Sequence, residues 1–287
     1  MKSITLLSPA KINLTLEILG KREDGYHEIR SIIQPVNLFD EINISIEQGE
    51  GIELNSKGLQ VPKGENNLAW KAADILIKEG GIRGKINISL TKKIPLGAGL
   101  GGGSSNAAAV LVGLNRIKKK FSQDELINLS SKIGADVAFF INCKTAIVEG
   151  FGEKITLIRD FPHYYYLLLN PGFEVATKKI YECWDELSHV AINHTNIDEI
   201  VSLFKSGAFP LRNDLKTPAT RRYPSITNLK ERLLNLGVEN ASMTGSGPTV
   251  FSIFKEEKSA KVFYNLLKDS SSFKVFLVKG ISGWHSL

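Results

Sequence analysis

The sequence predicts an α+β fold arranged as two domains. Short stretches alternate polar and apolar residues, as strands with one buried face do. Other stretches repeat apolar residues every three or four positions, as amphipathic helices do. Strands precede helices in each half of the chain, which is typical of α+β domains. Because Pro162 stands before a fresh strand in the segment 158–166, we expect domains of residues 1–158 and 159–287.

The expected elements follow from these patterns. Strands are predicted at residues 12–18, 41–47, 85–90, 164–169, 249–254 and 274–278. Helices are predicted at residues 67–79, 104–118, 224–236 and 259–268, and a further helix starts at Ser122. Helix 67–79 opens at an asparagine cap and ends before Gly80, and Glu125 completes a capping box with Ser122. Helix 224–236 begins with a proline and stops at Gly237, as helices commonly do.

The composition is that of an ordinary globular protein. The 287 residues are 43% hydrophobic and 23% charged, and no apolar run is long enough to span a membrane. The N-terminal segment lacks a signal-peptide pattern, and the two cysteines lack metal-ligand spacing, so we expect reduced thiols in a cytoplasmic protein. The net charge of +6 comes from scattered basic residues, which fits an anionic small substrate better than nucleic acid. We expect no nucleic-acid or membrane partner, and a monomer or homodimer.

The stretch PLGAGLGGGSSNAAAVLVGLN, residues 95–115, holds five glycines in seven positions directly before a predicted helix. Such a loop can aim successive backbone N–H groups at an anion, and the helix N-terminus adds its own free N–H groups and dipole. A flexible connector, a dinucleotide fingerprint and a P-loop are the alternatives. The strands around the loop alternate instead of being wholly apolar, and no lysine follows the glycines, so phosphate binding of another kind is favoured. The predicted phosphate-binding residues are Pro95, Leu96, Gly97, Ala98, Gly99, Leu100, Gly101, Gly102, Gly103, Ser104, Ser105 and Asn106, the two serine hydroxyls included.

This loop resembles the second motif of the GHMP small-molecule kinases, which include galactokinase, homoserine kinase and mevalonate kinase. SPAKINLTL at residues 8–16 is similar to their first motif, and ASMTGSGPTVFSIF at residues 241–254 is similar to their third. The three motifs stand in the same order and span most of the chain. The resemblance implies ATP as phosphate donor and a two-domain α+β GHMP kinase fold with the active site in the interdomain cleft.

Further stretches resemble one family within these kinases, the 4-diphosphocytidyl-2-C-methyl-erythritol kinases. They are AKINL, KREDGYHEIRSIIQ at residues 21–34, GLGGGSSNAA, and KIGADVAFF at residues 132–140. The resemblance implies ATP-dependent phosphorylation of the 2-hydroxyl of a cytidine-diphosphate-linked polyol, in the non-mevalonate route to isoprenoid precursors. Ala138 departs from the proline that the family usually has there. A homoserine- or mevalonate-type kinase, and an inactive nucleotide-binding protein on the same fold, are the alternatives.

The resemblance also assigns roles to two charged residues. Asp136 would accept or orient the proton of the attacking hydroxyl, and Lys11 would face it across the cleft and stabilise charge on the transferred phosphoryl group. Considered alone, Asp136 at a predicted helix end reads as a cap or turn residue, and Lys11 as a surface lysine.

Substrate residues come from the same comparison of motifs. Tyr26 and His27 resemble the cytosine site, and Tyr181 stands where the family usually has a second aromatic wall. The other expected contacts to the substrate or the phosphates are Asn13, Thr177, Thr244, Gly245, Ser246 and Gly247. Asn67 and Leu68 match positions beside the adenine, although a helix cap and a core residue explain them too. Mg²⁺ is expected with ATP, and no protein ligand for it is predicted.

Overall fold

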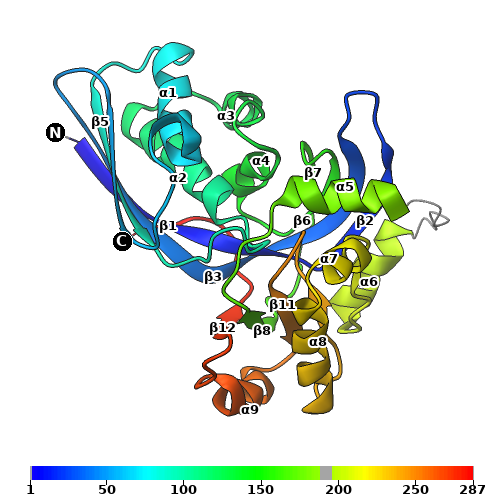
Figure 1. Cartoon of the computed structure of the whole chain (residues 1–287). Helices are drawn as coiled ribbons and strands as arrows, with labels where there is room; N and C mark the ends of the chain where they lie inside the picture. The colour runs from blue at the N-terminus through cyan, green and yellow to red at the C-terminus, as the bar shows by residue number, and fades with distance from the viewer. Residues whose placement is uncertain (1, 188–195, 287) are drawn as a thin grey trace.

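The computed structural model describes residues 2–187 and 196–286 and contains two sheets with helices around them (Figure 1). The large sheet is organised by one long strand, β3 (His27–Glu47). Along one edge of β3 run β1 (Lys2–Asn13) and then β2 (Thr15–Lys21), both antiparallel to it. Along the other edge run β5 (Lys85–Lys92) and β6 (Ala146–Gly150). The expected strand 12–18 is thus divided at Leu14, and the expected strand 41–47 is the end of β3.

Four further strands extend the large sheet. Strand β4 (Ile52–Gly58) pairs in parallel with β5, and β7 (Lys154–Leu157) pairs with β6. Two come from the C-terminal half: β9 (Arg212–Asn213) pairs in parallel with β2, and β13 (His285–Ser286) pairs with β1. The later part of the chain therefore supplies the strands that lie outside β1 and β2. The expected division at residue 158 stays a prediction.

One face of the large sheet is covered by helices (Figure 1). These are α1 (Leu68–Lys78), α2 (Gly102–Lys118), α3 (Gln123–Ser130) and α4 (Ala135–Asn142), and a single 3₁₀ turn, η1 (Gly64–Asn66), precedes α1. Helix α2 lies very close to the sheet because small residues face it. Ala107, Ala108 and Ala109 are fully buried, and a Cβ on Gly113 would lie 2.5 Å from the Ile44 side chain. This close packing fixes the position of the helix whose first turn follows the glycine-rich loop.

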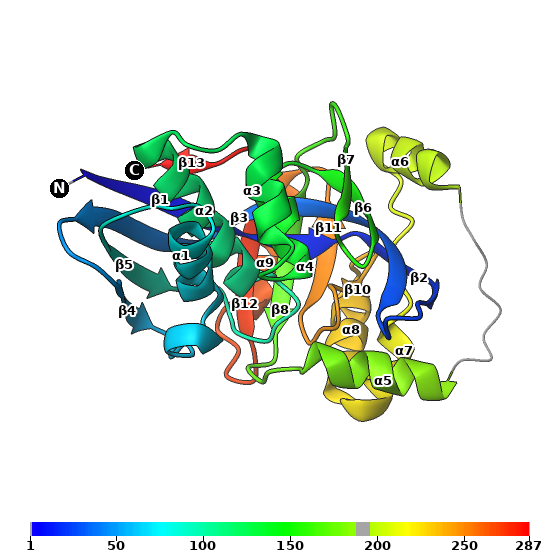
Figure 2. The ribbon, with the colours of Figure 1, turned by 90° about the horizontal axis from the view of Figure 1, so that it is seen from above.

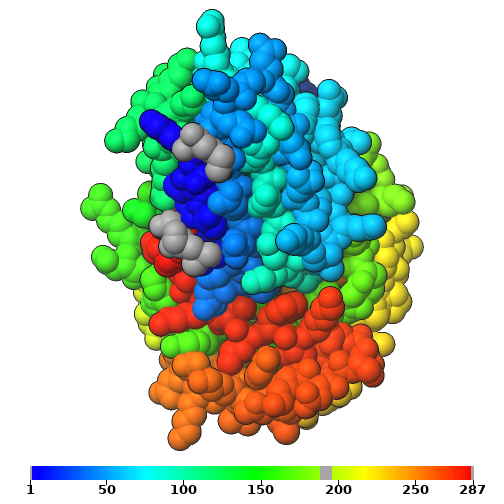
Figure 3. Space-filling view, turned by 90° about the vertical axis from the view of Figure 1, so that its left-hand side faces the viewer, coloured from blue at the N-terminus to red at the C-terminus, as the bar shows by residue number. Residues whose placement is uncertain are grey.

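The other face packs against the four-stranded sheet, with strand order β10–β11–β8–β12. These strands are β10 (Ser242–Met243), β11 (Val250–Phe254), β8 (Tyr165–Asn170) and β12 (Lys274–Lys279). Ala10 and Ile12 of the large sheet share a buried cluster with Tyr166 and Leu168 of the small one. Figure 3 shows the result from one side, with the N-terminal segments above the orange and red C-terminal segments.

The remaining helices surround the small sheet and the end of β2. They are α5 (Thr177–Leu187), α6 (Ile197–Ser206), α7 (Lys216–Arg222), α8 (Ser225–Asn235) and α9 (Glu257–Leu267). Figure 2 shows α5, α6 and α7 gathered at the β2 end of the molecule, away from α1. The mixture of sheets and helices confirms the α+β prediction.

Candidate active site

The register of β1 decides which way its residues face. Its pairing with β3 shifts between Pro9 and Ala10. Before the shift, Ser8 faces α2, where its hydroxyl lies 2.7 Å from that of Ser105. After it, Ala10 faces the small sheet, and the odd-numbered Lys11 lies on the side of the helices. An irregular register that redirects a side chain is common beside functional sites.

Lys11 and Asp136, the predicted catalytic pair, do meet. The Lys11 Nζ atom lies 3.7 Å from Oδ2 of Asp136 and also donates a hydrogen bond to Asn13 Oδ1. The Lys11 side chain is only 6% exposed, whereas that of Asp136 is 36% exposed and therefore open to a ligand. Asp136 was expected at a helix end. It lies instead in the first turn of α4, where the helix dipole favours its negative charge.

The glycine-rich loop, residues 95–101, joins β5 to α2 beside this pair. Gly97, Gly99 and Gly101 have φ angles of 54°, 74° and 68°. Residues with a Cβ atom rarely adopt these left-handed conformations, whereas glycine does so readily. The Lys11 N–H donates to the Leu100 carbonyl at 3.0 Å, so the loop is attached to β1. Among the residues that the structure describes, the backbone N–H groups of residues 96–104 have no acceptor. A row of free donors at a helix N-terminus is suited to bind an anion.

Two predicted phosphate-binding side chains point into the protein instead. Ser105 and Asn106 are buried, and Asn106 Nδ2 donates to the Ser8 hydroxyl at 3.1 Å and to Asp40 Oδ2 at 2.9 Å. The Ser105 N–H is bonded to the Gly101 carbonyl as part of α2. This placement does not support the expected contact between the Ser105 hydroxyl and a phosphate. Ser104, one residue earlier, is half-buried and keeps a free N–H group among the described residues.

Asp40, which the sequence reasoning missed, holds both ends of the loop. It is fully buried and accepts hydrogen bonds from Lys93 N at 2.7 Å and Ile94 N at 2.9 Å, before the loop, and from Asn106, after it. It also forms a buried ion pair with Lys92. Burial lowers the pKa of Lys92, although Asp40 opposes the shift. A lone aspartate inside a strand pattern gives no signal of this role in the sequence.

The third motif lies directly against the first two. The Thr244 hydroxyl accepts a hydrogen bond from Asn13 N at 2.9 Å and donates to the Gly99 carbonyl at 3.3 Å. A Cβ on Gly245 would lie 3.3 Å from Asn13 Oδ1. The Thr177 hydroxyl, at the start of α5, lies 2.9 Å from that of Ser246. The structure therefore brings the three motifs together.

Two of the predicted cytosine residues, His27 and Tyr181, form a separate corner beside the pair. The His27 ring stacks on Tyr181 with centroids 4.8 Å apart, and Trp184 meets it edge-on at 5.3 Å. Asp185 Oδ1 lies 2.6 Å from His27 Nε2. Burial raises the pKa of the Tyr181 phenol, and the negative charge of Asp136 raises it further. The corner therefore lies within electrostatic reach of Asp136.

Tyr26 does not join this stack. Its side chain is 63% exposed and packs against Phe151, with centroids 5.7 Å apart. The sequence reasoning also missed Trp184 and Asp185, although a signal was present. They follow Tyr181 by three and four positions in α5, which places all three on one helix face.

Asn67 and Leu68 have the structural roles of a helix cap and a residue packed against the core. The Asn67 side chain caps α1 by accepting a hydrogen bond from Ala69 N at 2.9 Å. Leu68 Cδ1 would lie 3.6 Å from a Cβ on Gly103, so the start of α1 adjoins the start of α2. Their expected contact with adenine stays a prediction.

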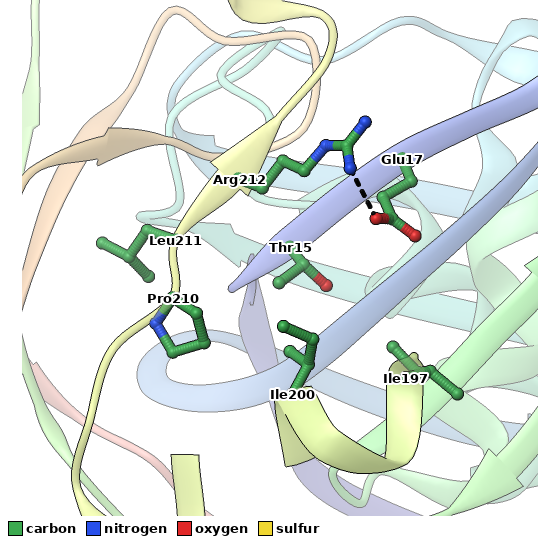
Figure 4. Close-up of a pocket in the computed structure, with 7 residues that line it drawn as sticks. All are labelled: Thr15, Glu17, Ile197, Ile200, Pro210, Leu211 and Arg212. Atoms are coloured by element: carbon green, nitrogen blue, oxygen red, sulfur yellow. Dashed lines mark hydrogen bonds and ion pairs between the residues drawn. The ribbon is translucent and has the colours of Figure 1, made fainter. Parts of the chain in front are cut away.

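A cavity of about 240 Å³ beside β2 is not this site (Figure 4). It is lined mainly by apolar side chains of α6 and the segment before β9, and the ion pair of Glu17 and Arg212 closes one side. None of the predicted site residues lines it. Within residues 2–187 and 196–286, no group of three His, Cys, Asp or Glu side chains could hold a metal ion. None of the described helices has the length and apolar character to span a bilayer.

Comparison with protein families matches both halves of the chain. Residues 67–144 match the family described as GHMP kinases N terminal domain, and residues 190–270 match the GHMP kinases C terminal family. The first match contains the glycine-rich loop and Asp136. The second lies entirely beyond the expected boundary at residue 158.

Individual relatives match over nearly the whole length. The chain is 42% identical over 267 residues to the 4-diphosphocytidyl-2-C-methyl-D-erythritol kinase of Geobacter sp. (strain M21), which covers 91% of this chain and 93% of the relative. It is 40% identical over 285 residues to the enzyme of the same name from Syntrophotalea carbinolica, with 97% and 99% covered.

Solved structures give the same picture. A crystal structure of 4-(cytidine 5'-diphospho)-2C-methyl-D-erythritol kinase has a TM-score of 0.84 at 30% identity, covering 97% of this chain and 100% of that one. The homoserine kinase of Cytophaga hutchinsonii has a TM-score of 0.73 at 18% identity over 100% and 98% of the two chains, which shows a shared fold alone.

Proposed function

The chain belongs to the 4-diphosphocytidyl-2-C-methyl-D-erythritol kinase family of GHMP kinases, and from that premise we propose that it phosphorylates the 2-hydroxyl of 4-diphosphocytidyl-2-C-methyl-D-erythritol with ATP. This is a step of the non-mevalonate route to isoprenoid precursors. One observation carries the proposal: Lys11 and Asp136 meet at 3.7 Å beside a glycine-rich loop whose described N–H groups lack acceptors.

The triphosphate of ATP supplies the acceptors for that loop. The N–H groups of residues 96–104 bind phosphate oxygens, and the N-terminus of α2 adds its dipole. Because the loop is tied to β1 through Leu100 and to the third motif through Gly99, its donors are already oriented before ATP binds. Preoriented donors cost no rearrangement during the reaction.

Phosphoryl transfer then depends mainly on position and charge. The substrate hydroxyl attacks the γ-phosphorus, the bond to the ADP oxygen breaks, and the hydroxyl proton passes to Asp136. Lys11 stabilises negative charge on the transferred group. The hydrogen bond to Asn13 and the burial of its side chain hold Lys11 in place.

The corner made by His27 and Tyr181 binds the cytidine end of the substrate. The His27 ring is held by Asp185 and by the stack on Tyr181, so its free edge has a fixed direction. The Tyr26 side chain, which is 63% exposed, turns away from Phe151 and packs on the base. Thr177 and Asn13 contact the polyol or its phosphates.

Mg²⁺ would bind together with ATP, mainly through phosphate oxygens and water, because this ion usually keeps several waters and takes few protein ligands. The ion would neutralise charge on the β- and γ-phosphates.

A coupled ADP-release assay tests the proposal. ATP, Mg²⁺ and the cytidine-diphosphate methylerythritol should give ADP release, homoserine and mevalonate should not, and phosphorus NMR should place the new phosphate on the 2-hydroxyl. Asp136→Asn and Lys11→Met should each lower kcat by about 100-fold or more. The proposal would be overturned if homoserine or mevalonate gave ADP release and the cytidine-diphosphate methylerythritol did not, or if both variants kept normal kcat.

A further inference from the structure

A second cavity, of about 210 Å³, lies between α7, α8 and the small sheet. Its base is apolar, and Ile226, Met243 and Val250 are buried there. Its other side is formed by lysine, threonine and glutamate side chains. The residues that line the cavity are Lys216, Thr220, Ile226, Thr227, Lys230, Glu231, Leu234, Met243 and Val250. Met243 and Val250 belong to the third motif, but none of the nine is among the predicted site residues.

Two lysines face each other in this cavity. Lys216 of α7 and Lys230 of α8 are both half-buried, and neither is seen in an ion pair among the described residues, although the exposed Glu231 also lines the cavity. The contact with Lys216, aided by burial, lowers the pKa of Lys230 to about 8. The buried Lys11 and Lys92, by contrast, each have an aspartate partner. Two adjacent cations without such a partner repel each other and favour an anion between them.

We propose that this cavity binds a small phosphate ester carrying a short apolar group. The two ammonium groups bind the phosphate, and the Thr227 hydroxyl can donate to its oxygens, whereas the Thr220 hydroxyl donates to the Thr217 carbonyl at 3.2 Å. The apolar group contacts the base formed by Met243 and Val250. The volume is below that of sites for drug-sized ligands, so the ester has only a few carbon atoms.

The cavity shares a wall with the third motif. A Cβ on Gly247 would lie 2.6 Å from Met243 Sδ and 3.5 Å from Ile226 Cδ1. The Met243 carbonyl and the Gly245 carbonyl both accept hydrogen bonds from Asn213 Nδ2, at 2.7 and 2.8 Å. A ligand against Met243 therefore adjoins the loop that contacts the glycine-rich loop.

Met243 provides a direct readout, because the chain has only two methionines, and the other is Met1. Protein labelled with ¹³C at the methionine methyls is titrated with butyl phosphate, with ADP present at saturation to occupy the glycine-rich loop. We expect a saturable shift of the Met243 signal and none of the Met1 signal. Inorganic phosphate should bind at least about tenfold more weakly, and butanol should not shift Met243 below about 10 mM.

Lys216→Gln and Lys230→Gln should each weaken butyl phosphate binding at least about tenfold, because each removes one cation. Lys205→Gln, at an exposed lysine of α6, is the matched control and should bind normally. Circular dichroism checks that each variant is folded. The proposal is overturned by an absent Met243 shift, by equal binding of inorganic phosphate, or by unchanged binding in both cavity variants, which would place the ester elsewhere.

Discussion

Gly101→Ala tests whether close backbone packing holds the catalytic lysine in place. Gly101 has a φ of 68°, and a Cβ there would lie 2.9 Å from Phe140 Cε2 and 3.0 Å from Lys11 Cγ. A left-handed alanine costs about 1–2 kcal/mol. Restoring ordinary contacts of 3.4 Å requires the buried Phe140 ring and the Lys11 stem to move by about 0.5 Å, and such overpacking costs about 1–3 kcal/mol.

The expected loss in the free energy of unfolding is therefore about 2–5 kcal/mol, measured by guanidinium chloride denaturation. Displacement of Lys11 relative to Asp136 should also lower kcat/KM by about tenfold to 100-fold in the ADP-release assay. Gly237→Ala is the matched control: its φ is 89°, but a Cβ there would meet nothing within 4 Å. It should lose only about 1–2 kcal/mol and no activity. Equal stability losses and normal kcat/KM in both variants would refute the reasoning.

Two further substitutions test charged partners of the site. Asp40→Asn should lower the free energy of unfolding by about 3–5 kcal/mol, because a buried lysine loses its partner. The control Asp74→Asn, at a partly exposed aspartate paired with an exposed lysine, should lose at most about 1 kcal/mol in the same denaturation experiment. Asp185→Asn should weaken CMP binding at least about tenfold in calorimetry, because His27 loses its partner, and the exposed Glu186→Gln should bind CMP normally; equal affinities would contradict this role. Burial alone would raise the pKa of Asp185, but hydrogen bonds from a lysine and His27 lower it below 3.8. Because the ionised form is the stabilised one, the stability difference between wild type and Asp185→Asn should be present above pH 3.8 and disappear as the pH falls below it, which acid titration followed by circular dichroism measures.

Local signals in the sequence were reliable where one segment determines the result. The cap at Asn67 and the capping box of Ser122 and Glu125 are both present, because each depends on residues a few positions apart. The glycine-rich loop likewise precedes a helix, which begins at Gly102 instead of residue 104. The three motifs could be placed together only through their resemblance to a family.

Features set by distant pairing could not be predicted from the sequence alone. The full length of β3 depends on partners at both its edges, so the local pattern indicated only its last seven residues. The direction of Lys11 depends on a register shift between β1 and β3. The stack of His27 on Tyr181 depends on where α5 lies, although the spacing of Trp184 and Asp185 behind Tyr181 was visible.

The arrangement of the glycine-rich loop also explains why so flexible a sequence can serve as a fixed site. A glycine-rich chain loses more conformational entropy on folding than any other, and free N–H groups give it no internal bonds in return. Asp40 offsets this by binding the backbone before the loop and Asn106 after it, so both ends are fixed by one buried carboxylate. The middle is fixed by Lys11 N and the Thr244 hydroxyl, which bind the carbonyls of Leu100 and Gly99. These contacts use the carbonyl groups and leave the N–H groups free, so the loop is held rigid without losing the donors that its proposed function requires.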